Sequence, residues 1–158
     1  MAITLRALTD SDLDSLFVWE SDPRAVELAA FTRADPSDRA AFDTHHERIR
    51  QDPSCTLRAI DDDEGAFVGT VGSYTMEGNR EVTYWIDPAR WGEGLASQAL
   101  RALLVLEPVR PLYGRVAEHN VGSAKVLERA GFVEVGSDTG FAPGLGTEVV
   151  ERIYRLDQ

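Results

Sequence analysis

Two glycines one residue apart, Gly92 and Gly94, stand at the start of a run with the composition of a helix, within DPARWGEGLASQALRALL. Glycine costs about 1 kcal/mol relative to alanine inside a helix, so the pair indicates a backbone geometry that side chains would obstruct. The N–H groups of a helix N-terminus have no intrahelical partner and attract anions, and glycines let a phosphate approach the main chain. The spacing therefore suggests a phosphate-binding turn, although a tight turn into the helix explains the same two glycines.

Other binding chemistries find less support in the sequence. The chain has no Gly-x-x-x-x-Gly-Lys-Ser/Thr pattern and lacks the third glycine of a dinucleotide-binding fingerprint. His45 and His46 are adjacent on a predicted helix, so their side chains diverge by about 100° and cannot share one metal ion. Cys55 is the only cysteine, which excludes a disulfide and thiolate-rich metal sites, and we expect it to be a small hydrophobic residue on a strand. We predict no metal site.

Length and charge bound the function classes. With 158 residues, 43% hydrophobic and 27% charged, the chain is expected to form a single domain over 1–158. It contains no apolar run near the about 20 residues of a membrane span, and its first residues lack a signal peptide's apolar region, so we expect a cytoplasmic protein without a membrane partner. The net charge of -11 argues against nucleic-acid binding and is compatible with a cationic substrate, although solubility explains an acidic surface equally well.

Hydrophobic periodicity and turn residues predict the elements that position these residues. In order, they are a strand at 3–8, a helix at 13–20, an irregular or short-helical segment at 21–37, a helix at 38–52, strands at 56–61, 66–76 and 80–87, a helix at 94–107, a strand at 112–117, a helix at 120–132, and strands at 132–138 and 148–156. The acidic run DDDEG favours a solvated hairpin turn over a cation site.

This order predicts the fold class. It gives an α/β (α+β) domain with a mixed, mostly antiparallel twisted sheet of about seven strands and helices on both faces. The strand at 80–87 is almost continuously apolar and is therefore expected to be central.

The segments REVTYWIDPARWGEGLASQALRALL and NVGSAKVLERAGF resemble the GNAT superfamily of acetyl-CoA-dependent N-acetyltransferases. The branch they resemble most includes the ribosomal-protein N-terminal acetyltransferases. The resemblance is specific over 81–132, and the outer elements are consistent with the same architecture over nearly the whole chain. It implies a GNAT-like acyl-CoA fold, acetyl-CoA as co-substrate and direct acetyl transfer to a primary amine, without an acyl-enzyme.

The resemblance also implies roles for individual residues. In the family, the backbone amides of a Gln/Arg-x-x-Gly-x-Gly/Ala loop hold the pyrophosphate of coenzyme A. The corresponding positions here are Trp91, Gly92, Glu93, Gly94, Leu95 and Ala96, followed by Ser97. Trp91 replaces the Gln/Arg of the family, and the backbone contacts do not depend on it. If Gly94 has ordinary helical angles, valine there would cost the fold well under about 1 kcal/mol, whereas a collapse of the fold would mean that Gly94 has angles only glycine accepts.

Three further positions complete the expected coenzyme A site. Ile86 or its neighbours on the preceding strand would pair with the pantetheine arm through main-chain groups. Asn120 and Ser123 match the family's Asn-x-x-Ser, which implies a pantetheine hydrogen bond for Asn120 and, for Ser123, a hydroxyl that protonates the leaving thiolate. Both also have a plain structural interpretation, as the N-cap and a first-turn residue of a helix.

Glu81 is the candidate general base, because an ammonium cannot attack a thioester until its proton is removed, and many family members use a carboxylate on this strand. The alternative is a solvated carboxylate at a strand end. Tyr84 and Trp85 are expected to be core aromatics. The favoured function is an N-acetyltransferase acting on a small molecule or a protein N-terminus, as a monomer or homodimer. The alternative is a non-catalytic acyl-CoA sensor or interaction module, since fold alone does not determine activity.

Overall fold

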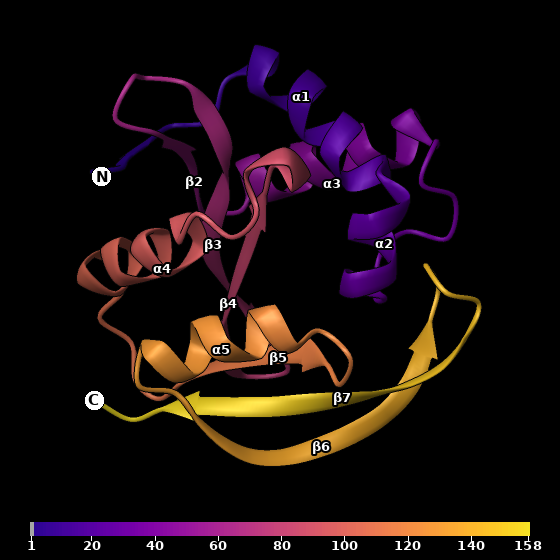
Figure 1. Cartoon of the computed structure of the whole chain (residues 1–158), viewed down its shortest axis with the longest axis vertical. Coiled ribbons are helices and arrows are strands. Elements are labelled where there is room, and N and C mark those ends of the chain that lie inside the picture. Colours follow the sequence, from indigo (N-terminus) through magenta and orange to yellow (C-terminus); the bar gives the residue numbers. More distant parts are fainter. Residues whose placement is uncertain (1) are drawn as a thin grey trace.

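A seven-stranded sheet in the order β1-β2-β3-β4-β5-β7-β6 runs through the computed structural model, which describes residues 2–158 (Figure 1). Its strands are β1 (Thr4–Arg6), β2 (Thr56–Asp61), β3 (Phe67–Met76), β4 (Asn79–Ile86), β5 (Leu112–Ala117), β6 (Val133–Ala142) and β7 (Thr147–Leu156). Neighbouring strands are antiparallel except β4 and β5, which are parallel. The predicted mixed, mostly antiparallel sheet is therefore confirmed.

The helices are α1 (Asp10–Ser21), α2 (Pro23–Ala29), α3 (Arg39–Gln51), α4 (Leu95–Leu106) and α5 (Val121–Arg129). Thr9 caps α1: its side chain accepts the backbone N–H of Asp12, and the Asp12 carboxylate accepts the backbone N–H of Thr9. The segment at 21–37, expected to be irregular or short-helical, contains α2, which begins at Pro23 and has Asp22 as its N-cap. Proline suits this first position because its missing N–H would have no helical partner.

Successive side chains of the central strand β4 point to opposite faces of the sheet, and helices cover both faces. Val82 and Ile86 pack in the core formed with α4 and α5. Trp85 packs on the other face against a cluster formed by Leu13 and Leu16 of α1 and Phe42 of α3. No helix within residues 2–158 combines the length and apolar character needed to cross a membrane.

Strands β4 and β5 separate soon after they meet. They pair only at Arg80 with Leu112 and at Glu81 with Tyr113, whereas β4 pairs with β3 along its whole length. The backbone N–H of Asp87 donates to Val68 of β3, so the alternation along the strand turns the backbone groups of Ile86 toward the gap. The sheet is thus open between its two central strands.

A buried ion pair secures the paired end of β4. The Glu107 carboxylate, just after α4, accepts hydrogen bonds from Arg80 Nε at 2.7 Å and Ser73 Oγ at 2.6 Å. Glu107 is only 5% exposed. Burial opposes its ionisation, but the bonds from Ser73, Arg80 and the Val109 backbone are stronger and hold its pKa below the usual value.

Candidate active site

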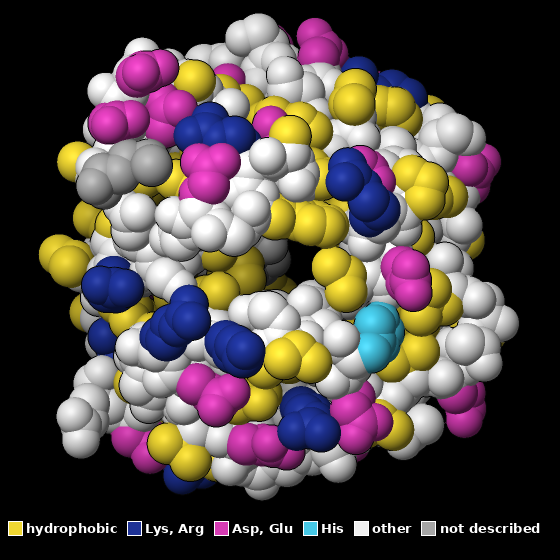
Figure 2. Space-filling model, viewed as in Figure 1, with side chains coloured by type: hydrophobic (Ala, Val, Ile, Leu, Met, Phe, Trp, Pro, Cys, Tyr) yellow, Lys and Arg dark blue, Asp and Glu magenta, His cyan; other side chains and the backbone are white. Residues whose placement is uncertain are grey.

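A cavity of about 1570 Å³ occupies the gap between β4 and β5 and reaches both faces of the sheet. One part is lined by the glycine loop and α5, and the other by residues of α2 and α3. Figure 2 shows a deep opening near the middle of one molecular face. The cavity exceeds the roughly 300–1,000 Å³ of a typical small-molecule site, so it has room for two reactants.

The two glycines that opened the sequence analysis both have left-handed backbone angles. Gly92 has φ +84° and Gly94 has φ +79°, and apart from the glycine and its two chain neighbours no atom of the described chain lies within 4 Å of where a Cβ would stand on either. Gly94 therefore does not meet the condition of ordinary helical angles, because it is the N-cap residue and α4 begins at Leu95. Glycine is needed here for its backbone conformation as well as for an open approach to the main chain.

The N-terminus of α4 is equipped to hold an anion. No side chain among residues 2–158 caps it, so the N–H groups of its first turn, including those of Ala96 and Ser97, are available to a ligand. Ser97 lines the cavity and is 6% exposed, and its buried Oγ has no hydrogen-bond partner within residues 2–158. An unpartnered buried hydroxyl beside free amides fits a phosphate group of coenzyme A.

Ion pairs fix the loop that precedes α4. Arg90 Nε lies 3.0 Å from both carboxylate oxygens of Glu93, and Arg90 Nη1 lies 3.1 Å from Asp62 Oδ2. Asp62 belongs to the predicted DDDEG turn and also accepts the backbone N–H groups of Glu64 and Ala66. Asp62 therefore holds the glycine loop through Arg90. The Arg90 guanidinium also compensates the negative charge of Glu93 beside the candidate anion site.

Trp91 has a role that its position in the loop did not indicate. Its indole Nε1 donates a 3.1 Å hydrogen bond to the Ile86 carbonyl, and its ring lies 5.9 Å from the Arg24 guanidinium of α2. Ile86 is the residue expected to pair with pantetheine. Its carbonyl already accepts one bond, which leaves its second lone pair and its N–H facing the gap.

Glu81 lies at the last paired position before β4 and β5 diverge. It lines the cavity and is 3% exposed, so the interpretation of a solvated strand-end carboxylate was wrong. Burial raises the pKa of Glu81, although Arg115, whose Nε lies 3.5 Å from its carboxylate, opposes the rise. A carboxylate with a raised pKa is a stronger base and is better matched to proton transfer near neutral pH.

Arg115 is shared among three carboxylates. Besides Glu81, its Nη1 lies 3.1 Å from Glu151 and 3.4 Å from Asp138. Burial also raises the pKa of Tyr74, which stands opposite Glu81 on β3, to about 12. This part of the cavity wall therefore carries an excess of negative charge, which favours a positively charged acceptor.

Asn120 and Ser123 stand together at the start of α5, and both line the cavity. The Asn120 side-chain oxygen accepts the Ser123 backbone N–H at 3.2 Å, so the predicted N-cap is confirmed. Ser123 Oγ lies 2.7 Å from the hydroxyl of Tyr84. We had expected Tyr84 to be a plain core aromatic, but its ring packs in the core while its hydroxyl reaches the cavity wall.

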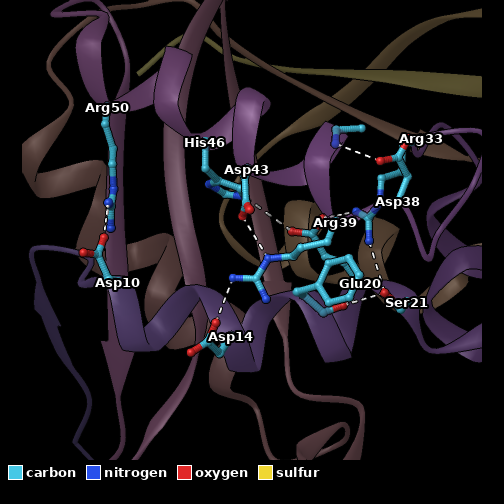
Figure 3. A network of polar contacts seen from close by, with 12 residues as sticks. Asp10, Asp14, Glu20, Ser21, Arg33, Asp38, Arg39, Asp43, His46 and Arg50 are labelled. Carbon is cyan, nitrogen blue, oxygen red and sulfur yellow. Dashed lines mark hydrogen bonds and ion pairs between the residues drawn. The ribbon is translucent and has the colours of Figure 1, made fainter.

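Sequence reasoning missed the buried polar group on the α1–α3 side of the cavity. Figure 3 shows three side chains of this group close together: Glu20 of α1, Arg33 from the segment between α2 and α3, and His46 of α3. Arg33 Nη1 donates to Glu20 at 3.0 Å, and His46 Nε2 lies 4.0 Å from the other Glu20 oxygen. Burial raises the pKa of Glu20 to about 7 and lowers that of His46 to about 4, so His46 is neutral at physiological pH.

Cys55 also lines the cavity, which corrects its expected place on a strand. It lies just before β2, is half-buried, and has its Sγ 3.6 Å from an Asp52 carboxylate oxygen. Burial and the neighbouring carboxylate raise the pKa of the thiol. Cys55 is therefore a poor nucleophile at neutral pH.

Comparisons with known proteins agree with this geometry. Residues 2–133 match the family described as Acetyltransferase (GNAT) domain. The chain is 28% identical over 151 residues to "Putative phosphinothricin acetyltransferase YwnH" of Bacillus subtilis (strain 168), covering 89% of this chain and 90% of that relative.

Two solved structures share the fold. Spermidine N-acetyltransferase from Vibrio cholerae, in complex with CoA and spermine, has a TM-score of 0.78 at 22% identity, covering 96% of this chain and 94% of that chain. RimL, a ribosomal L7/L12 alpha-N-protein acetyltransferase, has a TM-score of 0.80 at 17% identity, covering 100% and 91%.

The open sheet with its mostly antiparallel strands is the fold shared with these acetyltransferases. The chain belongs to the GNAT family of acetyltransferases.

Proposed function

We propose that this chain is an N-acetyltransferase that moves the acetyl group of acetyl-CoA directly to a primary amine. The observation that carries the proposal is the cavity through the open sheet. It joins the glycine loop and Ser123 to the buried carboxylate of Glu81. This arrangement lets a thioester and an amine meet from opposite faces of the sheet, with a base available on the amine's side.

Each group has a distinct task in the proposed reaction. The first-turn amides of α4 and Ser97 Oγ bind the phosphate groups of acetyl-CoA. Glu81 receives the proton of the ammonium, through water, because its burial favours the protonated carboxyl. The raised pKa of the Cys55 thiol supports direct transfer over an acyl-cysteine intermediate. The excess negative charge around Arg115 favours an acceptor that arrives as a cation. Both a small amine and a protein N-terminus meet that requirement.

The test is release of free thiol from acetyl-CoA in the presence of a panel of amines, which includes polyamines, amino acids and peptides with free N-termini. Formation of the acetylated amine is followed by mass spectrometry. An acetyltransferase releases thiol and acetylates at least one amine in equal amounts. Binding of acetyl-CoA without thiol release from any amine contradicts the proposal and favours the sensor alternative. The absence of binding contradicts both.

A further inference from the structure

The part of the cavity next to α2 has an apolar wall. Phe31, two positions beyond the end of α2, lines the cavity and remains 36% exposed. The charged residues of the helix, Arg24 and Glu27, do not line it. The residues of α2 that do line it have apolar side chains: Ala25, Leu28 and Ala29. The apolar wall therefore continues from the helix to an aromatic ring that the rest of the described chain leaves partly uncovered.

A strained turn joins Phe31 to the helix. Ala30 has φ +62° and ψ −52°, angles that a residue with a Cβ rarely adopts. The Phe31 N–H donates to the Ala29 carbonyl at 2.6 Å, which closes a three-residue γ-turn of the strained form around Ala30. Such a conformation persists only where the surrounding structure holds it, and strained residues cluster at ligand sites. The turn therefore indicates that the place of Phe31 is constrained.

The β6–β7 hairpin holds this turn. Gly144, at the hairpin tip, donates its N–H to the Ala30 carbonyl at 3.0 Å, and Figure 1 shows the tip beside α2. A Cβ on Gly144 would lie only 2.8 Å from that carbonyl oxygen, so no larger residue fits without a shift of the backbone. A second tie comes from His119, after β5, whose Nε2 lies 2.6 Å from the Glu27 carbonyl oxygen. The end of α2 is thus fixed to two separate segments.

The Phe31 ring lies against the backbone of β6. A Cβ on Gly140 would be 3.7 Å from a carbon of the ring, which is ordinary van der Waals contact. The neighbouring strand β7 carries Glu151, which lines the same cavity. Glu81 and Glu151, both paired with Arg115, form the charged region of this cavity. One cavity therefore offers carboxylates for an ammonium and an apolar, aromatic edge.

We propose that Phe31 is a specificity-determining residue, and that the acceptor is a primary amine with an apolar group that packs against the Phe31 ring while its ammonium lies near Glu81. This inference rests on the proposed function and narrows its substrate class. A polyamine would place a second charge against the apolar wall of α2. A free amino acid would bring its carboxylate toward Glu81 and Glu151, which repel it.

The experiment compares two primary amines that differ by one apolar group. Phenylalaninamide and glycinamide each carry one ammonium and no carboxylate, and kcat and KM are measured for both at saturating acetyl-CoA. We expect the parent to favour phenylalaninamide by at least about tenfold in kcat/KM, since apolar contacts in an enzyme pocket discriminate by about 10- to 200-fold. Phe31→Ala should abolish this preference through KM, with the kinetics of glycinamide and the affinity for acetyl-CoA unchanged. Phe31→Leu, which keeps an apolar side chain, should retain most of the preference.

Matched variants separate Phe31 from its surroundings. Phe141→Ala removes an exposed aromatic residue of β6 that does not line the cavity, and it should leave the preference unchanged. Gly144→Ala should reduce the preference, because it displaces the hairpin tip that holds the turn at Ala30. Gly136→Ala, on β6 with open space at the Cβ position and no positive φ, should retain it.

Several results would overturn the inference. An equal loss of activity toward both amines in Phe31→Ala makes the residue structural, and an unchanged preference excludes it from the acceptor site. Faster acetylation of spermidine or of phenylalanine than of phenylalaninamide overturns the apolar substrate class. A full preference in Gly144→Ala shows that the hairpin does not position Phe31.

A binding measurement distinguishes this inference from the proposed function. Both amines are titrated by calorimetry into the protein saturated with coenzyme A, which requires no turnover. Tighter binding of phenylalaninamide, lost in Phe31→Ala, without thiol release from any amine supports the apolar subsite and overturns only the transferase proposal. Equal binding of the two amines, or no binding of either, overturns the subsite itself.

Discussion

Replacing Gly94 with alanine separates the conformational role of the loop from its role in binding. Gly94 has φ +79°, and a left-handed angle costs a residue with a Cβ about 1–2 kcal/mol. Because open space surrounds the Cβ position within the described chain, no steric clash adds to this cost. In a protein of this size each kcal/mol lowers the melting temperature by about 2–4 °C, so we expect a fall of about 2–8 °C. Any backbone rotation that relieves the strain turns the amides of α4 away from their ligand, and we expect acetyl-CoA affinity to fall at least about tenfold.

The matched control is Gly78→Ala, in the turn between β3 and β4. Gly78 has φ +83° and the same open surroundings, but it lies outside the cavity lining. Both variants should lose similar melting temperature, measured by calorimetry without ligand. Only Gly94→Ala should lose affinity, measured by titration calorimetry on the same preparations. If Gly94→Ala binds acetyl-CoA as tightly as Gly78→Ala does, the two glycines of the loop serve only to form a turn and the phosphate groups bind elsewhere.

Three further variants test the rest of the site. Glu81→Gln should lower kcat by about 10²- to 10⁴-fold with acetyl-CoA affinity nearly unchanged. In the parent, kcat/KM should fall as the pH drops through the raised pKa of Glu81. If the variant keeps the parent's kcat and the same fall at low pH, the base lies elsewhere. Ser97→Ala should weaken coenzyme A binding by about 3- to 10-fold in titration calorimetry, and equal affinity excludes its hydroxyl from the site. Glu107→Leu should lower the free energy of unfolding by about 3–5 kcal/mol in urea, because it leaves Arg80 buried without its partner, whereas Asp157→Asn, in an exposed pair, should change it little.

Local sequence patterns were enough to predict the elements around the site. The apolar run of β4 and the N-cap at Asn120 each depend on residues within a few positions of one another. The pattern at 91–97 likewise indicated the N-terminus of α4. Its helix boundary was misplaced by one residue because helical composition does not reveal that Gly94 has a positive φ.

Contacts between distant segments could not be predicted in the same way. The Tyr84–Ser123 pair spans 39 positions and the ion pair between Glu81 and Arg115 spans 34, and no local pattern specifies either. Residue type was also misleading, because Tyr84 behaves as a core aromatic through its ring and as a polar residue through its hydroxyl. A signal for Tyr84 did exist: the two-residue period of β4 places it on the same face as Val82 and Ile86, where α5 packs.

The open sheet implies that ligand binding and stability are coupled. Where β4 and β5 separate, the backbone groups of Tyr84 and Ile86 face the gap, and the Trp91 indole satisfies only the Ile86 carbonyl. An extended ligand with amide groups, such as the pantetheine arm that the family resemblance places here, would supply partners to the remaining groups at strand spacing. At one hundred times its dissociation constant, acetyl-CoA should therefore stabilise the fold by about 2.7 kcal/mol, which raises the melting temperature by roughly 5–11 °C. Adenosine diphosphate carries phosphates but no pantetheine arm, so at the same concentration as acetyl-CoA it should give a smaller rise; an equal rise would show that the gap between β4 and β5 does not hold the pantetheine arm.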